Sequence, residues 1–223
     1  MCGRFDQNDT ARTIRAFQWT GDLFNRSQAE PRFNVSPGTF RPIMHIEDDA
    51  LAVDDLWWSY RPGWAKGKIP IAVNAKIEKL ASAYWRPLMT RGRAVVGASG
   101  WYEWTGEKGS KQPWHIHHHD HEPIFMLALA NFGPAREARE ETGFVLLTSE
   151  SAGGMVDVHD RRPVVLSAAD AHLWLDPDLS PLQAEELARS AALGVDEFEW
   201  YRVSTEVNRA GTDGPQLVVP IAA

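Results

Sequence analysis

The stretch Ala94-Val95-Val96-Gly97-Ala98-Ser99-Gly100-Trp101-Tyr102-Glu103-Trp104 holds two strand patterns in a row. Residues 94–98 form a short, continuous apolar run, which is typical of a buried strand. Residues 100–104 are rich in aromatic side chains, which favour the pleated surface of a second strand. This pair predicts a β-sheet in the middle of the chain.

Apolar segments on both sides of this pair predict further strands, at residues 43–46, 51–53, 113–118, 123–130, 144–148 and 164–166. The first two are expected to form a hairpin across an acidic tip, and the third is expected to pair with the fourth. Capping residues and helical spacing predict helices at residues 8–18, 76–83, after Ser167, and from Ser180 to near Gly194. Strands in the middle and helices toward both ends indicate one α+β domain over residues 1–223.

The composition narrows the class of protein. The chain has 223 residues, a net charge of −7 and one cysteine. The negative charge argues against a general nucleic-acid coat, so a nucleic-acid partner would need a confined basic site. A single cysteine excludes an intramolecular disulfide and fits a reducing compartment. We find neither a signal-peptide pattern nor an apolar run of about 18 residues, so we expect a cytoplasmic protein without membrane contact.

The lone cysteine, Cys2, directly follows the initiator Met1. Methionine is generally removed before a small residue, which would leave an α-amine and a thiol on the same residue. Such an aminothiol can attack an acyl carbon through its thiolate, or condense with an aldehyde into a five-membered thiazolidine ring. The alternative is that Cys2 is simply a small buried apolar residue.

Three more polar residues lie where the local pattern predicts burial or a tight turn. Asn74 stands between an apolar run and a helix, where it either caps the helix or projects into a cleft. Glu103 shares a strand face with Trp101, a setting that raises a carboxyl pKa and suits acid–base work, although a plain edge-strand glutamate fits as well. His159 precedes an apolar strand and is either a proton shuttle or a structural residue of a turn.

Two polar segments allow both a functional and a structural interpretation. In the turn at residues 32–38, Asn34 and Ser36 either hold a phosphate or cap the turn. A histidine run comprises His115, His117, His118, His119 and His121. This run lacks a cysteine or carboxylate at zinc-like spacing, so we expect a solvated hairpin tip and no metal site. The common glycine motifs for nucleotides are missing as well, and no cofactor is expected.

Five short motifs occur in one order along nearly the whole chain. They are Met1-Cys2-Gly3-Arg4-Phe5, Arg32-Phe33-Asn34-Val35-Ser36-Pro37, Asn74-Ala75-Lys76-Ile77-Glu78, Gly100-Trp101-Tyr102-Glu103-Trp104 and Val158-His159-Asp160-Arg161-Arg162-Pro163-Val164-Val165-Leu166. Together they resemble the SRAP (SOS response-associated peptidase) family, whose best-understood bacterial members are abasic-site processing proteins. The resemblance rests on the combination, since each motif alone is weak.

The resemblance implies strongly bent antiparallel sheets that form a barrel-like core with peripheral helices, and a narrow cleft for single-stranded DNA. It also implies covalent capture of abasic sites, because the open sugar exposes the aldehyde that an N-terminal aminothiol traps. In this mechanism Cys2 supplies the amine and the thiol, and Asn74 holds the N-terminus and the sugar in register. Glu103 manages protons at the amine, and His159 aids the opening of the sugar ring.

Residues that match expected DNA-contacting positions are Gly3, Arg4, Asn34, Pro37, Trp64, Lys76, Arg86, Thr148, Arg161 and Arg162. The family usually has arginine at the position of Lys76, so a two-pronged phosphate contact becomes a single point charge here. The resemblance further implies a monomeric DNA-repair protein that is associated with the nucleoid when bound to DNA. Abasic-site lyase activity and self-removal of Met1 are expected as accompanying activities.

Two other functions are consistent with the sequence. Cys2 could be the N-terminal nucleophile of a peptidase or amidohydrolase, since Met-Cys-Gly also opens glutamine amidotransferases of that type. Such an enzyme needs oxyanion donors, which the sequence does not identify. The other function is non-covalent binding of single-stranded DNA, with Cys2 merely buried. Replacing Cys2 with alanine separates these functions, because a binder keeps its affinity whereas a crosslinker loses its covalent product.

Overall fold

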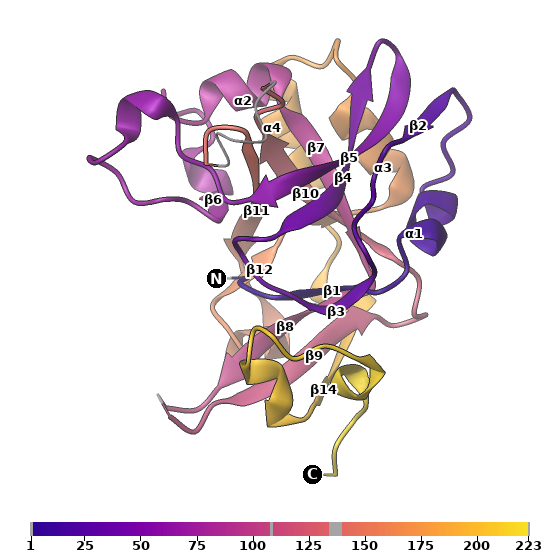
Figure 1. The fold of residues 1–223 in the computed structure, drawn as a ribbon, viewed down its shortest axis with the longest axis vertical. Coiled ribbons are helices and arrows are strands. Elements are labelled where there is room, and N and C mark those ends of the chain that lie inside the picture. Colours follow the sequence, from indigo (N-terminus) through magenta and orange to yellow (C-terminus); the bar gives the residue numbers. More distant parts are fainter. Residues whose placement is uncertain (1, 108, 134–139, 223) are drawn as a thin grey trace.

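The computed structural model describes residues 2–107, 109–133 and 140–222 (Figure 1). Its strands are β1 (Phe5–Gln7), β2 (Leu23–Asn25), β3 (Arg32–Val35), β4 (Phe40–Glu47), β5 (Ala50–Trp58), β6 (Asn74–Lys76), β7 (Arg93–Ala98), β8 (Gly100–Thr105), β9 (Gln112–His118), β10 (Ile124–Ala130), β11 (Gly143–Glu150), β12 (Arg161–Pro163), β13 (Val165–Leu166) and β14 (Phe198–Arg202). Its α-helices are α1 (Thr10–Ala16), α2 (Arg86–Arg91), α3 (Ala168–Leu175) and α4 (Pro181–Ser190). Short 3-10 turns are η1 (Gly63–Ala65), η2 (Ile77–Lys79), η3 (Gly153–Asp157), η4 (Val195–Glu197), η5 (Thr205–Asn208) and η6 (Pro215–Val218).

The larger sheet closes on itself. Its strands follow the order β12-β11-β10-β7-β4-β5-β2, and β5 also pairs with β11 where Trp57 and Trp58 face Gly143 and Phe144. The strands β11, β10, β7, β4 and β5 therefore form a ring, which confirms the expected barrel-like core of an α+β fold. The β5–β11 pair is parallel, as are β2–β5 and β6–β11, whereas the other strand pairs in the described part of the chain are antiparallel.

The smaller sheet has the order β14-β9-β8-β1-β3 and lies below the ring in Figure 1. Its strand β1 packs against the ring through Phe5. Phe5 on β1 pairs with Trp101 on β8. The aromatic ring centroid of Phe5 lies 4.8 Å from that of Trp58, which belongs to β5 of the closed sheet. One buried apolar cluster includes these three aromatic residues and Cys2. The N-terminal residues are therefore anchored at the junction of the two sheets.

Most of the locally predicted elements are present. β7 and β8 match residues 94–98 and 100–104, and β4 and β5 form the predicted hairpin. The side chains of Asp9, Ser167 and Ser180 cap the N-termini of α1, α3 and α4, since each accepts a hydrogen bond from the backbone three residues on. None of the described helices is long and apolar enough to cross a membrane.

Three predicted elements differ from the structure. Residues 76–83 do not form an α-helix, because Asn74–Lys76 is a strand that pairs with β11 and only the single turn η2 follows. Helix α4 ends at Ser190, before Gly194. β9 and β10 do not pair with each other, since β9 lies between β8 and β14 whereas β10 lies in the ring.

The predicted solvated tip of the histidine run is also wrong in part. His115 and His117 are buried, at 4% and 3% exposure. The reason is that β14 pairs with β9 and places Tyr201 opposite His115 and Glu199 opposite His117. Their rings contact Tyr201 of β14, whose hydroxyl lies 3.2 Å from Nδ1 of His115. The solvent-facing part of the run begins only at its end, at residues 119 and 121.

Candidate active site

Cys2 lies just before β1 and is fully buried. Its Sγ is 3.8 Å from the carbonyl oxygen of Arg4, a weak hydrogen bond. Burial raises the pKa of the Cys2 thiol well above its ordinary value, and the nearby Glu103 carboxyl raises it further. The thiol is therefore held protonated, and any reaction through sulfur requires a group that accepts its proton.

Asn74 connects the N-terminal segment to the ring. It begins β6, where it faces Leu146 in the parallel pairing with β11. Its Nδ2 donates a hydrogen bond of 2.8 Å to the carbonyl oxygen of Cys2. Its Oδ1 is buried and has no hydrogen-bond partner among the described residues. Asn74 is therefore not a helix cap, and it holds the backbone of Cys2 while its other polar atom is free for a ligand.

Glu103 is buried on β8 at 2% exposure. Burial raises the pKa of its carboxyl to about 8, because the charged form is poorly solvated there. Its Oε1 lacks a hydrogen-bond partner within the described part of the chain. A carboxyl with a pKa near neutrality can both donate and accept a proton, which is what general acid–base chemistry requires.

His159 lies beside Glu103, with its Nε2 at 3.9 Å from the Glu103 carboxylate. Nδ1 of the ring has a partner in each charge state. In the neutral ring it accepts from the Arg161 backbone N–H at 3.0 Å, and in the protonated ring it faces the Asp160 carboxylate at 2.9 Å. Burial lowers the pKa of His159, so the neutral ring, with its proton on Nε2 toward Glu103, is favoured.

The structure thus brings together the four residues expected to carry the chemistry. Asn74 holds the Cys2 backbone, the Glu103 carboxyl raises the pKa of the Cys2 thiol, and His159 lies 3.9 Å from Glu103. They come from the N-terminal segment, β6, β8 and the turn before β12, so both sheets contribute. The arrangement places an imidazole 3.9 Å from a carboxyl that acts electrostatically on the Cys2 thiol, with an amide that fixes the N-terminal backbone.

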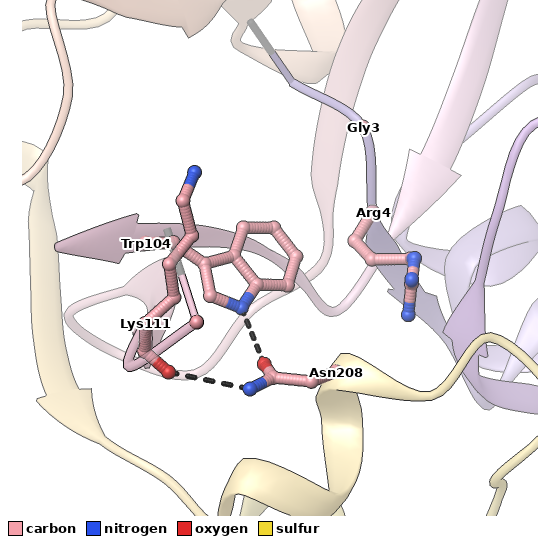
Figure 2. Close-up of a pocket in the computed structure, with 6 residues that line it drawn as sticks. Gly3, Arg4, Trp104, Lys111 and Asn208 are labelled. Atoms are coloured by element: carbon pink, nitrogen blue, oxygen red, sulfur yellow. Dashed lines mark hydrogen bonds between the residues drawn. The ribbon is translucent and has the colours of Figure 1, made fainter. Parts of the chain in front are cut away.

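A cavity of about 400 Å³ adjoins this N-terminal backbone and is lined by Gly3, Arg4, Trp104, Gly109, Lys111 and Asn208. Figure 2 shows Trp104 between the cationic side chains of Arg4 and Lys111. The Trp104 indole N–H donates to Asn208 at 2.6 Å, and Asn208 in turn donates to the Lys111 carbonyl at 3.2 Å (Figure 2). Two cations beside a held aromatic ring suit a phosphate and a stacked base.

Trp104, Lys111 and Asn208 were not among the residues expected to contact DNA. Trp104 belongs to the aromatic strand motif, and it follows Glu103 on the opposite strand face, which directs it away from the buried carboxyl. Asn208 lies on η5, 104 positions from Trp104 and 97 positions from Lys111, its partners in this cavity. A tryptophan followed by a lysine-containing turn is a local signal in the sequence that could have indicated this cavity.

Several residues predicted to contact phosphates are enclosed by internal partners. Both amide hydrogens of Asn34 are used, since its Nδ2 donates to the carbonyl oxygens of Val207, Arg209 and Thr212. Arg161 pairs with Glu78 at 2.9 Å and also donates to Thr148, which is fully buried. Phosphate contact by these residues stays a prediction, and in the structure their side chains make internal hydrogen bonds.

The other predicted DNA contacts range from exposed to buried. Lys76 and Arg86 are exposed, and Trp64 is 62% exposed with its ring against Tyr84. Gly3 and Arg4 line the cavity, and Pro37 is half-buried in the turn after β3. Arg162 is buried over the Phe198 ring, and its Nε and Nη1 have no hydrogen-bond partner among the described residues. These residues differ in accessibility, and the exposed ones are the more direct candidates for contact.

Known proteins resemble this chain over its full length. A family model described as SOS response associated peptidase (SRAP) matches residues 1–210. The abasic site processing protein YedK of Escherichia coli K12 is 36% identical, across 99% of this chain and 100% of YedK. The abasic site processing protein HMCES of Gallus gallus is 26% identical, across 99% of this chain and 78% of HMCES.

Solved structures share the fold. A phage-related protein of Bordetella bronchiseptica is 37% identical with a TM-score of 0.78, covering 92% of this chain and 95% of its own. A protein of Bacteroides thetaiotaomicron has the same TM-score at 18% identity, over 99% of this chain and 100% of its own, which shows the fold alone. From the family match and the relative at 36% identity, the chain belongs to the SOS response associated peptidase (SRAP) family.

Proposed function

We propose that this protein processes abasic sites in single-stranded DNA by forming a covalent link between the lesion and Cys2. The observation that carries the proposal is the junction of Cys2 with Asn74, Glu103 and His159. The names of the relatives YedK and HMCES support the same substrate. The protein acts as a monomer and reaches its lesion in the cytoplasm, at the nucleoid.

The chemistry begins with removal of Met1, which turns the Cys2 backbone nitrogen into a free amine. The amine attacks C1′ of the open sugar and gives an imine with loss of water. The thiol then adds across the C=N bond and closes a thiazolidine ring, so that its proton moves to nitrogen. Holding the reacting groups in place lowers the barrier to this closure by several kcal/mol, about 7 in well-oriented systems.

Each neighbouring side chain has a role in these reaction steps. The Asn74 amide fixes the Cys2 carbonyl, which orients the amine and the thiol of the same residue. Glu103, with its pKa near neutrality, accepts the proton of the buried thiol and returns it to nitrogen. His159 exchanges protons with the sugar oxygen when the ring opens, since its favoured neutral form carries a proton on Nε2.

The DNA strand binds in the cavity beside Cys2. Arg4 and Lys111 bind a phosphate next to the lesion, and Trp104 stacks on a neighbouring base. Such contacts do not read sequence, so the lesion is selected by its aldehyde and by the missing base. The same imine permits strand cleavage by a lyase step, and release of Met1 is the peptidase reaction that the site performs on its own chain.

The test is a denaturing gel of purified protein with a single-stranded oligonucleotide that contains one abasic site. We expect a heat-stable shifted band whose intact mass equals protein without Met1 plus DNA minus water. Peptide mapping should place the modification on Cys2, and undamaged DNA should give no band. A protein shown to lack Met1 that still gives no adduct would refute the proposal and would direct attention to amide and peptide substrates.

Replacing Lys76 with alanine should weaken binding to all single-stranded oligonucleotides about equally. The reason is that an exposed lysine on β6, two residues after Asn74, neutralises one phosphate without reading a base. The logarithm of the DNA association constant falls linearly with the logarithm of the salt concentration. The steepness of this line should decrease by about 0.7, the contribution of one phosphate contact in a single strand. Fluorescence anisotropy at several salt concentrations measures both quantities.

Arg12→Ala is the matched control for Lys76, because it also removes one positive charge. Arg12 lies on α1, across the molecule from the N-terminus in Figure 1, in an exposed ion pair with Glu122. This variant should keep the wild-type affinity and salt slope. Equal losses in the two variants would show that Lys76 acts only through net charge and not through a phosphate contact.

A further inference from the structure

The end of the histidine run meets a carboxylate that is distant in sequence. His118 ends β9 and faces Phe198, the first residue of β14, so that Glu197 at the end of η4 comes alongside His119. The His119 backbone N–H donates to the Glu197 carbonyl at 3.0 Å. This pairing brings the backbone of the turn at His119 next to Glu197, so the three side chains start from neighbouring positions.

The ligand atoms of these side chains lie close together. Nε2 of His119 and Nε2 of His118 are 3.3 Å and 3.5 Å from Oε2 of Glu197. All three ligand atoms lie within 4.8 Å of one another. Zinc bonds of about 2.0–2.1 Å to nitrogen and oxygen give a tetrahedron with edges of about 3.4 Å. The two distances from Glu197 Oε2 to the histidine nitrogens therefore have the length that zinc requires. The third distance, between the two histidine nitrogens, is at most 4.8 Å, and a small rotation of the exposed His119 ring can shorten it.

Asp120 orients the first ligand. Its Oδ1 lies 2.5 Å from Nδ1 of His118 and also accepts the Glu122 backbone N–H at 2.8 Å. An imidazole that donates Nδ1–H to a carboxylate presents the lone pair of Nε2, which in His118 faces Glu197. Histidines that bind metals commonly have such a carboxylate partner, which fixes the tautomer and raises the basicity of the ligand.

The site is open enough for an ion to enter. The His118 side chain is 16% exposed, whereas His119 and Glu197 are 47% and 40% exposed. A cavity of about 460 Å³ has His118, Asp120 and Glu197 in its wall. This cavity leaves room for water at a fourth position. The buried histidines of the run do not take part, since His115 and His117 lie on the part of β9 that contacts Tyr201.

We propose that His118, His119 and Glu197 bind one Zn²⁺ ion, with Asp120 as the positioning residue and water as the fourth ligand. The expectation of no metal site was based on the absence of a cysteine or carboxylate at zinc-like spacing, and Glu197, directly before β14, supplies a carboxylate from a distant segment. The ion joins the end of β9 to η4. This site uses none of the residues around Cys2, so it is independent of the function proposed for them.

The experiment titrates Co²⁺ and then Zn²⁺ into the full chain, with a Cys2→Ala background because a thiol can itself bind zinc. We expect one equivalent of Co²⁺ to give the visible absorption of a tetrahedral site without a thiolate charge-transfer band. Zn²⁺ should displace it and raise the Tm. His119→Ala and Glu197→Gln should each weaken Zn²⁺ binding at least tenfold, with little change in the Tm of the metal-free protein.

Two further variants separate a metal site from general attraction to histidines. His121→Asn removes an imidazole from the same run and suits the left-handed backbone at this position, where φ is 62°, so it should bind Zn²⁺ like the wild type. Asp120→Asn keeps the oxygen that accepts from Glu122 but loses the charge, and it should weaken binding about 10- to 100-fold. Asp120→Glu should restore part of that loss. Equal Zn²⁺ affinity in the wild type, His119→Ala and Glu197→Gln would overturn the proposal, as would an absence of 1:1 binding.

Discussion

Cys2→Ala should abolish the covalent product with abasic DNA while leaving non-covalent binding within about twofold of the wild type. The thiol is buried and makes only a weak hydrogen bond, to the Arg4 carbonyl, among the hydrogen bonds of the described residues, so alanine fits its place with little disturbance. The alanine amine can still form an imine, but no thiol follows to close the ring. A denaturing gel and an anisotropy titration on the same samples measure the two effects.

Cys2→Ser refines this result, because serine keeps the amine and supplies a hydroxyl that is a far weaker nucleophile than a thiol. The serine variant should give an adduct only when borohydride traps the imine, whereas the wild type should give one without reduction. A wild-type level of heat-stable adduct in Cys2→Ala would show that another nucleophile forms the link. Loss of DNA affinity in both variants would instead point to a structural role for Cys2 in binding.

Glu103→Gln should slow adduct formation by about 10²-fold or more, the usual effect of removing a general acid–base group. Glutamine has nearly the same shape, so it keeps the packing of β8 against Cys2 but cannot accept the thiol proton. Single-turnover kinetics at saturating DNA measure this rate. DNA affinity serves as the internal control and should be unchanged, since Glu103 is buried.

The same substitution should stabilise the protein in alkaline solution. Burial raises the pKa of Glu103 from its ordinary 4.5 to about 8, so between these pH values the folded protein holds a proton that the unfolded chain has released. The Glu103 contribution to the free energy of unfolding therefore declines as the pH rises from about 4.5 to about 8. Urea unfolding at pH 5, 7 and 9 should show Glu103→Gln gaining relative to the wild type, by a few kcal/mol at pH 9, because one pKa unit is worth about 1.4 kcal/mol.

Parallel stability curves for the wild type and Glu103→Gln across this range would contradict the raised pKa. A slower reaction together with a more stable fold would show that the site keeps a buried carboxyl at a cost in stability, as functional sites often do. The two measurements on one variant therefore distinguish a proton-transfer role from a packing role. A packing role would lower stability at every pH.

The sequence predicted those strands and helix caps that depend on residues close together in the chain. β7 and β8 follow from apolar and aromatic runs, and the caps at Ser167 and Ser180 follow from short-range hydrogen bonds. The helix expected after Asn74 is absent because β6 takes its hydrogen bonds from β11, which is some 70 positions away. Tertiary pairing overrode a weak helical preference there.

The site was predictable as a set of residues but not as a geometry. The motifs around Cys2, Asn74, Glu103 and His159 drew attention to them, yet only the fold shows that Asn74 holds the Cys2 carbonyl. The burial of His115 and His117 was missed because β14, the strand that covers them, follows more than 70 positions later. The same distance hid Glu197 from His119, since spacing rules for metal ligands apply within a segment.

The parallel pairing of Trp57 and Trp58 with Gly143 and Phe144 has a consequence for biosynthesis. A chain still on the ribosome cannot close this ring until residues beyond 144 have emerged, and the turn that carries His159 comes later still. Contacts so far apart in sequence also slow folding, since the loop between them must be closed first. Until then Cys2 lies outside its completed pocket, so release of Met1 by this site has to wait until most of the chain has been made.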